Sequence, residues 1–291
     1  MFVVNEYGTE PETVLESHGI RVLTMDSIAF ASLALAGEVI VTGSHGGASA
    51  GQYARRAGVA AVVCNDAGVG KDGAGIAGLR AVGADGIAGI AVGHDSARIG
   101  DGRDAWLNGV VTFVNDPARA AGVRHGLPLR EQARGLIEHL TASPAERRAG
   151  AGEGGDELRR IVVVDRPRGG VVLLDSMSQA GDGDRGHVVV AASNGGKESG
   201  RIAVLVGCAC AVFNDAGVGK DEAGIAGLAL MDRAGLPGVA ASHLSAAISD
   251  GPDLWESGVI SHVNEAARAA GFEAGTRVAD AVRRFVERRE G

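Results

Sequence analysis

The chain has 291 residues, enough for two domains or one duplicated domain, and 45% of them are hydrophobic, so a sizeable core is available. Its net charge of −8 and sequence pI of about 5.5 argue against a nucleic-acid-binding protein, which needs a basic surface to meet phosphates. Aromatic residues make up only 3% while Gly numbers 47, so the core must be built mainly from small aliphatic side chains with closely packed backbones.

The sequence also argues against secretion and membrane insertion. It starts MFVVNEYGTEPE, with acids and Pro where a signal peptide has a basic and then an apolar region. The longest apolar stretch, residues 28–42, is interrupted by polar residues and is too short to span a bilayer. An odd number of cysteines without a paired framework is typical of a reducing compartment. These cysteines are Cys64, Cys208 and Cys210. We therefore expect a cytoplasmic protein with no membrane partner.

The most prominent internal feature is a repeat at an offset of 149 residues. Residues 65–79 read NDAGVGKDGAGIAGL and residues 214–228 read NDAGVGKDEAGIAGL, so 14 of 15 positions match. The same offset needs no gap from about residue 13 to residue 140. We predict a first α/β unit at 13–140 and a second at 161–289, packed about a pseudo-two-fold axis. A charged, Gly-rich linker joins them at 141–160.

Short apolar runs, taken in chain order, predict the strands of each unit. They are continuous rather than alternating, which is typical of parallel strands covered by helices on both faces. The first unit has Ile20–Met25, Glu38–Thr42, Ala60–Cys64, Ile87–Val92 and Gly109–Val114. The second unit has Val171–Leu174, His187–Ala191, Ala209–Phe213, Gly238–Ala241 and Gly258–Val263.

Segments between these runs predict the helices. In the first unit, residues 49–57, 74–82 and 117–121 are long enough for crossover helices. Each unit closes with apolar residues at helical spacing, from Leu129 to Ile137 and from Val278 to Val286. The predicted fold is an internally duplicated α/β fold with mostly parallel sheets, each unit doubly wound.

Polar motifs follow the predicted strands. The carboxyl ends of parallel strands meet at one edge of a sheet, where open α/β sheets bind ligands. A single motif of this kind is more often a turn or a helix cap, because Asn, Asp, Ser and Gly suit those positions. Several together, with histidines among them, favour a site. In the first unit they are Asp26-Ser27, Ser44-His45-Gly46-Gly47, Asn65-Asp66, His94-Asp95-Ser96 and Asn115.

The NDAGVGKD loop suggests an anion site. Gly68 and Gly70 follow a strand and precede a helix, so their backbone N–H groups could hold an anion, with Lys71 adding charge. The spacing to Gly73 resembles the dinucleotide fingerprint, but the second copy has Glu222 at that third position. The alternative is that these glycines permit tight packing of helix on strand.

Histidines suggest acid–base chemistry. His45, on a Gly-rich strand end, is a candidate general base or ligand, and its counterpart is Asn194. His94 and His243 open the repeated blocks HDSARIGDGRDAW and HLSAAISDGPDLW, which also carry carboxylates. Such a set could pair a base with the group that orients it, or could hold a divalent metal through mixed N and O ligands. The spacing of these residues does not decide between the two, so a metal cofactor stays open.

Differences between the copies could divide the labour of an asymmetric reaction. The first copy supplies arginines suited to a carboxylate, and the second supplies other charged or titratable groups. Neutral drift in one copy would produce the same pattern. The main swaps are His45/Asn194, Ala48/Lys197, Ser49/Glu198, Arg98/Ala247, Arg103/Pro252 and Phe113/His262.

These patterns define two sets of candidate site residues. The catalytic set is His45, Asp66, His94, Lys197 and His243. The substrate-binding set is Ser44, Gly46, Gly47, Asn65, Lys71, Arg98, Arg103, Ser193, Asn194, Glu198, Asn214, Asp215 and Lys220.

The leading interpretation is a cytoplasmic enzyme that acts on a small polar or anionic metabolite by acid–base chemistry. Hydrolysis of an amide or lactam, or a lyase step, fits best, because His, Asp, Ser and Lys occur without a redox motif. One alternative is a non-catalytic protein that binds an anion or nucleotide through the duplicated Gly-rich loops. Another is a structural subunit whose Gly- and Ala-rich surfaces assemble a homo-oligomer.

Overall fold

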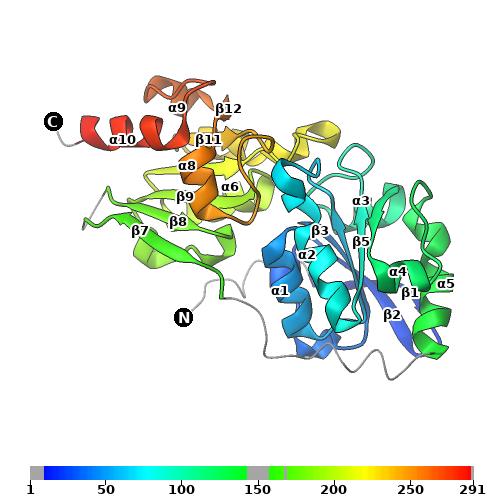
Figure 1. Cartoon of the computed structure of the whole chain (residues 1–291). Helices are drawn as coiled ribbons and strands as arrows, with labels where there is room; N and C mark the ends of the chain where they lie inside the picture. The colour runs from blue at the N-terminus through cyan, green and yellow to red at the C-terminus, as the bar shows by residue number, and fades with distance from the viewer. Residues whose placement is uncertain (1–9, 143–156, 167–168, 290–291) are drawn as a thin grey trace. The chain divides into compact units, whose positions relative to one another are not determined.

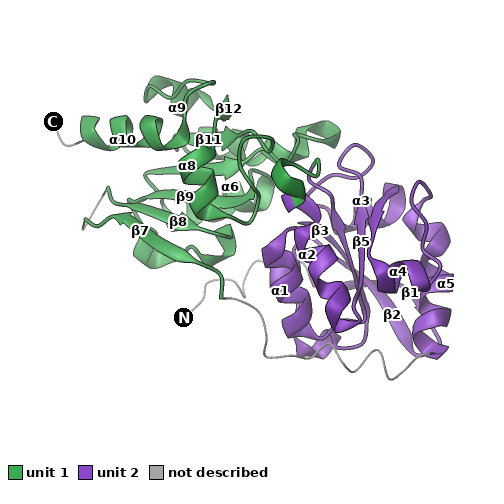
Figure 2. Ribbon diagram, in the orientation of Figure 1, with its two compact units in different colours: residues 1–3, 68–73, 157–291 green, residues 4–67, 74–156 purple. Residues whose placement is uncertain are grey.

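A computed structural model describes residues 10–142, 157–166 and 169–289, which divide into two compact units (Figures 1 and 2). Of these residues, unit 2 takes in 10–67 and 74–142, and unit 1 takes in 68–73, 157–166 and 169–289. Each unit contains one six-stranded, mostly parallel sheet, so the predicted duplicated α/β fold is confirmed. Most of the predicted linker, from 143 to 156, lies outside the described residues.

Unit 2 has the strand order β1-β2-β3-β4-β5-β6. Strands β2 to β5 are parallel, and β1 and β6 pair antiparallel at the two edges. The strands are β1 Glu12–Ser17, β2 Ile20–Met25, β3 Val39–His45, β4 Ala61–Asn65, β5 Ala88–Val92 and β6 Val111–Val114. The α-helices are α1 Ala48–Ala57, α2 Ala77–Ala81, α3 Gly102–Asn108, α4 Asp116–Ala120 and α5 Leu129–Ala142.

Unit 1 repeats this arrangement, with the order β12-β11-β10-β9-β8-β7 and antiparallel strands at both edges. The strands are β7 Arg160–Val164, β8 Val171–Leu174, β9 Val188–Asn194, β10 Cys210–Asn214, β11 Gly238–Ala241 and β12 Ile260–Val263. The α-helices are α6 Lys197–Val206, α7 Gly227–Arg233, α8 Gly251–Ser257, α9 Glu265–Ala269 and α10 Val278–Arg288.

Strand order corrects two sequence-based expectations. Across each sheet the strands follow one another in chain order, and the order never reverses as it does in a doubly wound sheet. The prediction of doubly wound units is therefore wrong. Because β6 runs antiparallel to β5, Asn115 lies at the opposite edge from the residues that follow β3, β4 and β5. The Asn115 amide instead donates to Leu79 O at 3.0 Å and Ile87 O at 2.9 Å, and its Oδ1 caps α4 at the Ala118 N–H. Asn115 therefore joins elements of the fold.

Both faces of each sheet are covered by helices, as alternation along the central strands shows. In β4, Ala61 and Val63 pack in one cluster with residues of α3, α4 and α5. Val62 and Cys64 point to the other face and pack with α1 and α2. Strand β10 repeats the pattern between two clusters of unit 1. This leaves strand ends as the places where polar side chains can gather. Among the described helices, none combines the length and the apolar character needed to cross a membrane.

Candidate functional site

An Asp–His pair occupies the carboxyl edge of the parallel strands in unit 2. Asp66 directly follows β4, and His94 lies two residues beyond β5. The Nδ1 atom of His94 lies 2.9 Å from Asp66 Oδ1, and the same oxygen accepts the backbone N–H of His94 at 3.0 Å. Thr112, on β6, donates its hydroxyl to Asp66 Oδ2 at 2.9 Å. Asp66 is only 4% exposed, and hydrogen bonds to both of its oxygens fix the carboxylate in place.

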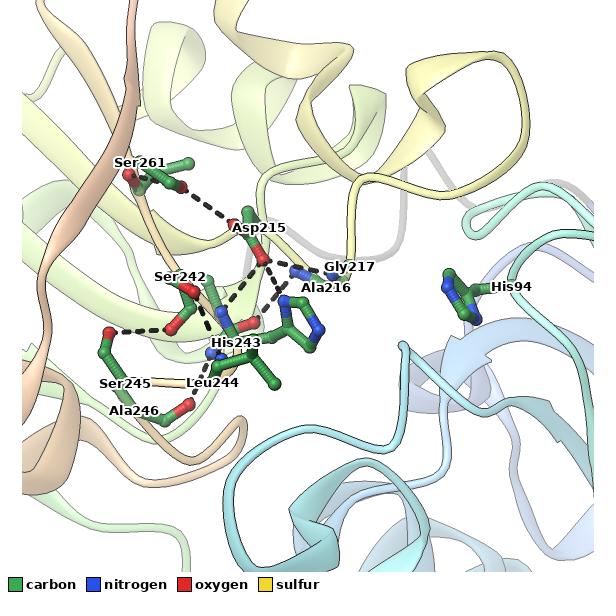
Figure 3. A network of polar contacts seen from close by, with 12 residues as sticks. His94, Asp215, Ala216, Gly217, Ser242, His243, Leu244, Ser245, Ala246 and Ser261 are labelled. Carbon is green, nitrogen blue, oxygen red and sulfur yellow. Dashed lines mark hydrogen bonds and ion pairs between the residues drawn. The ribbon is translucent and has the colours of Figure 1, made fainter. Parts of the chain in front are cut away.

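Unit 1 holds the equivalent pair (Figure 3). His243 Nδ1 lies 2.9 Å from Asp215 Oδ1, which also accepts the N–H groups of His243 at 2.9 Å and Gly217 at 3.0 Å. Ser261 donates to Asp215 Oδ2 at 2.8 Å and takes the place of Thr112. The pair and its hydroxyl partner are therefore part of the repeated unit.

Each pair can orient an imidazole for proton transfer. A carboxylate only accepts hydrogen bonds, so Asp66 and Asp215 hold a proton on Nδ1 and turn Nε2 toward the outside of the pair. The side chains of His94 and His243 are 25% and 21% exposed. The hydrogen bond to Asp66 raises the pKa of His94 against the opposing effect of partial burial, and the charges of Asp66 and Asp95 raise it further. This is the geometry of a base and the group that orients it.

Asn65 and Asn214, which directly precede Asp66 and Asp215, hold the backbone around each pair in place. The buried Asn65 amide donates to Ala97 O and accepts from Ala67 N, both at 2.9 Å. Asn214 makes the same two bonds, to Ala246 and Ala216, at the same distance. Each Asn thus ties its strand end to the start of the loop and to the segment that follows the histidine. The structure places both predicted substrate-binding residues in this supporting role.

The loop after each pair has unusual backbone geometry. In the first copy Ala67, Val69 and Asp72 have φ of 50°, 63° and 54°, and the glycines among them are also positive. A left-handed conformation is costly for residues with a Cβ, above all for β-branched Val. Gly70 N bonds to Gly68 O at 2.7 Å, so this donor is used within the turn. The second copy shows the same pattern from Ala216 to Glu222. Donors turned into the loop give little support to the predicted anion cradle.

His45 and Asn194 end equivalent strands and make the same contact. His45 Nδ1 accepts from Gly47 N at 3.2 Å, and Asn194 Oδ1 accepts from Gly196 N at 3.0 Å. His45 is 6% exposed, and burial lowers its pKa to about 4, so the ring is neutral near pH 7. The swap between the two copies therefore preserves a turn that opens α1 or α6.

Several other predicted residues are engaged in the fold. Ser44 Oγ accepts from Ile28 N at 3.0 Å, and Ser193 Oγ accepts from Met177 N at 2.8 Å. A Cβ on Gly46 would lie 2.5 Å from Leu79 Cδ1. Gly47 is buried as well, and its carbonyl oxygen would lie 2.1 Å from a Cβ on Gly78. Close packing against α2 explains both glycines.

The predicted charged residues mostly lie in ion pairs. Arg98 Nη1 lies 3.0 Å from Asp104 Oδ1, and Arg103 pairs with Glu12. Lys71, in the segment that belongs to unit 1, has its Nζ 2.6 Å from Asp253 Oδ1. The remaining positions are Glu198, 2.9 Å from Arg201 Nε, Lys197, exposed at the start of α6, and Lys220, half-buried. The side-chain charges of Arg98, Arg103, Lys71 and Glu198 are thus each paired with an oppositely charged residue.

Thr112 and Ser261 are functional candidates that the sequence analysis missed. They occupy equivalent positions at the 149-residue offset and both carry a hydroxyl, which is the signal that could have found them.

Across the described ranges, no three His, Cys, Asp or Glu side chains come together as a metal-ligand group. No family model, curated protein or solved structure matches the chain.

Proposed function

We propose that the protein is an enzyme that transfers protons to and from a small polar or anionic substrate, with His94 and His243 as the transferring groups. The observation that carries this proposal is the buried Asp that fixes Nδ1 of each imidazole and is itself fixed by a hydroxyl. Such an arrangement holds each ring in one orientation, with Nε2 free of the Asp and able to exchange a proton with a bound substrate.

Two reaction classes fit this group. In amide or lactam hydrolysis, the imidazole takes a proton from the attacking water and returns it to the leaving nitrogen as the C–N bond breaks. In a lyase step it removes a proton from carbon, the C–H electron pair forms a C=C bond, and the leaving oxygen or nitrogen departs with its bonding pair and takes up a proton. A thiol nucleophile has no support in the described residues, because burial raises the pKa of Cys64 and of Cys208 to about 12, and that of Cys210 as well. These unpaired thiols support a cytoplasmic location.

A panel of small amides, lactams and hydroxy acids would test the proposal. We expect turnover by the natural chain and a loss of about 10²–10⁴-fold in His94→Gln or His243→Gln, the usual effect of losing a general base. His125→Gln, at an exposed position, is the matched control. A ligand that raises the melting temperature equally in the natural chain and in all three variants, without turnover, would instead favour a binding protein.

A further inference from the structure

We propose that Lys71 is a positioning residue that fastens segment 68–73 beside the His243 ring, where Gly68 restricts access to Nε2 to small reactants. The inference deepens the proposed function, because it names the size of the group on which His243 can act. It rests on that function only for the role of His243 in proton transfer. The placement of the segment rests on contacts within unit 1.

Lys71 contacts the loop that carries His243 at two points. Segment 68–73 packs as part of unit 1. The Lys71 backbone N–H donates to His243 O at 2.8 Å, and its Nζ lies 2.6 Å from Asp253 Oδ1. The second oxygen of Asp253 accepts the backbone N–H of Ala247 at 2.7 Å. Asp253 therefore joins the Lys71 ammonium to the loop at residues 243–247, and one side chain sets how the segment lies on that loop.

Two glycines bring the segment directly against His243. Gly68 has a φ of 70°, a conformation that favours glycine, and a Cβ built on it would lie 3.0 Å from both Cδ2 and Nε2 of His243. Non-bonded carbon atoms pack best at about 3.5–4.0 Å, so a larger residue here would have to displace the ring or the segment. A Cβ on Gly70 would likewise lie 2.9 Å from His243 O. The segment thus passes the ring with backbone atoms where other residues would place side chains.

The position of Gly68 matters because Asp215 occupies the other side of the ring. Nδ1 of His243 lies against Asp215 Oδ1, so proton exchange with a reactant is left to Nε2. Gly68 lies beside that nitrogen, and the His243 side chain is 21% exposed. The segment therefore narrows the approach to Nε2 without closing it. A short, unbranched group on the reactant fits such an approach better than a branched or aromatic one.

A difference between the two copies leaves room for Lys71 at Asp253. In the first copy Asp104 stands at the position of Asp253, and its Oδ2 accepts the Arg98 N–H at 2.7 Å. The Arg98 guanidinium also lies 3.0 Å from Asp104 Oδ1. Ala247 takes the place of this arginine in the second copy, so no guanidinium from that position competes with Lys71 for Asp253 Oδ1. Ala247→Arg should therefore weaken the Lys71 contact although Lys71 itself is unchanged.

Acylation of histidine by two dicarbonate esters of different bulk tests this inference without a substrate. Diethyl dicarbonate and di-tert-butyl dicarbonate react with the neutral imidazole in the same way, and mass spectrometry of peptides gives the rate at each histidine. Rates at His243 are divided by those at His125, an exposed position in the same chain. In the natural chain we expect a lower ratio with the di-tert-butyl reagent than with the diethyl reagent.

Two variants release the segment while changing its charge environment in opposite directions. In Lys71→Met and in Ala247→Arg we expect the ratio for the di-tert-butyl reagent to rise about two- to fivefold, the effect of losing a partly exposed ion pair on local opening. The ratio for the diethyl reagent should rise less. Lys71→Arg, which keeps the cation, should stay near the natural value. Arg284→Met, which removes an exposed cation elsewhere in unit 1, is the matched control.

The result separates this inference from the proposed function. The inference is wrong if both reagents gain equally, if neither ratio changes, or if only Lys71→Met responds, because a change of charge alone would explain the last result. If the size selection is found but His243→Gln leaves turnover unchanged, the proposed function fails and the placement of the segment stands. If turnover depends on His243 but the reagents do not discriminate, only the inference fails. Circular dichroism checks folding, and the natural chain with either variant suffices if the other variant fails to fold.

Discussion

At the scale of single residues, His45 and His94 meet opposite environments within one unit. His45 is enclosed by the fold, and its Nδ1 accepts a hydrogen bond from a backbone N–H, so protonation would place an uncompensated charge in the interior. His94 is only partly buried and lies against a carboxylate. The two imidazoles should therefore shift the stability of the protein in opposite directions as the pH changes.

We expect His45→Asn, which introduces the residue of the second copy, to reduce acid sensitivity. The pKa of His45 is about 4 in the folded protein and about 6.5 in the unfolded chain, so its stability contribution is lost as pH falls from 6.5 toward 4. Between pH 8 and pH 5 the natural chain should lose about 2 kcal/mol more than the variant. Urea unfolding at both pH values measures this, and parallel losses would contradict it.

His94→Gln should show the opposite dependence. The folded pKa of His94 is raised, so its contribution to stability is fully present below the unfolded pKa and is lost as pH rises through the folded pKa. The melting temperature of His94→Gln should fall furthest below that of the natural chain at pH 5.5 and least at pH 9. A deficit that grows with pH would exclude the favourable Asp66–His94 pairing.

The sequence was informative about these residues to different degrees. Repetition pointed to Asp66, His94 and their counterparts, because the carboxyl ends of neighbouring parallel strands must lie together. It could not identify Thr112, because a continuous apolar run does not show the direction of a strand, and β6 runs antiparallel. His45 looked equally reactive as a sequence position. Its burial depends on packing that no local pattern encodes.

At the scale of elements, the strained loops offer a test. Val69 has φ of 63° and is 41% exposed, so a substitution removes strain and little buried surface. Relief of a left-handed Val is worth about 1–2 kcal/mol, and the flexibility of Gly in the unfolded chain offsets about 0.5–1 kcal/mol. Val69→Gly should therefore leave stability unchanged or raise it by up to about 1 kcal/mol, measured by urea unfolding.

Val162→Gly, in edge strand β7, is the matched control for that loop, since Val162 is 52% exposed and has ordinary strand geometry. The Val162→Gly substitution should lower the free energy of unfolding by about 1 kcal/mol. Equal losses in the two variants would mean that Val69 carries no relievable strain.

Elements themselves were predictable where burial leaves a signal. All ten predicted apolar runs overlap strands of the structure. For β2, β8 and β11 the predicted bounds are also the observed ones. Strand β1 was missed because it is an edge strand whose polar and charged residues interrupt any apolar run, whereas β7 does carry an apolar run, Ile161–Val164, that was not assigned to a strand. The order of the strands in each sheet could not be predicted either, since an apolar run does not show which strands pair with it.

At the scale of the whole molecule, each unit has its own cores. Of the four hydrophobic clusters found in the described residues, two draw only on unit 2 and two only on unit 1. Trp106 and Trp255 occupy equivalent places in one cluster of each unit and are 8% and 6% exposed. Each Trp can therefore report on its own unit when the other is replaced by Phe.

Core substitutions should then act on one unit at a time. Ile90 is fully buried in the cluster of Trp106, and Ile90→Ala should cost about 2–5 kcal/mol. With a urea dependence of about 1–3 kcal/mol per M, the midpoint reported by Trp106 should fall by roughly 1–2 M, while that reported by Trp255 changes much less. Val239→Ala, at the equivalent position in the other unit, should reverse the pattern. Equal shifts of both midpoints in either variant would show that the duplicated chain unfolds as one cooperative body, because damage to one core would then be felt in full by the other.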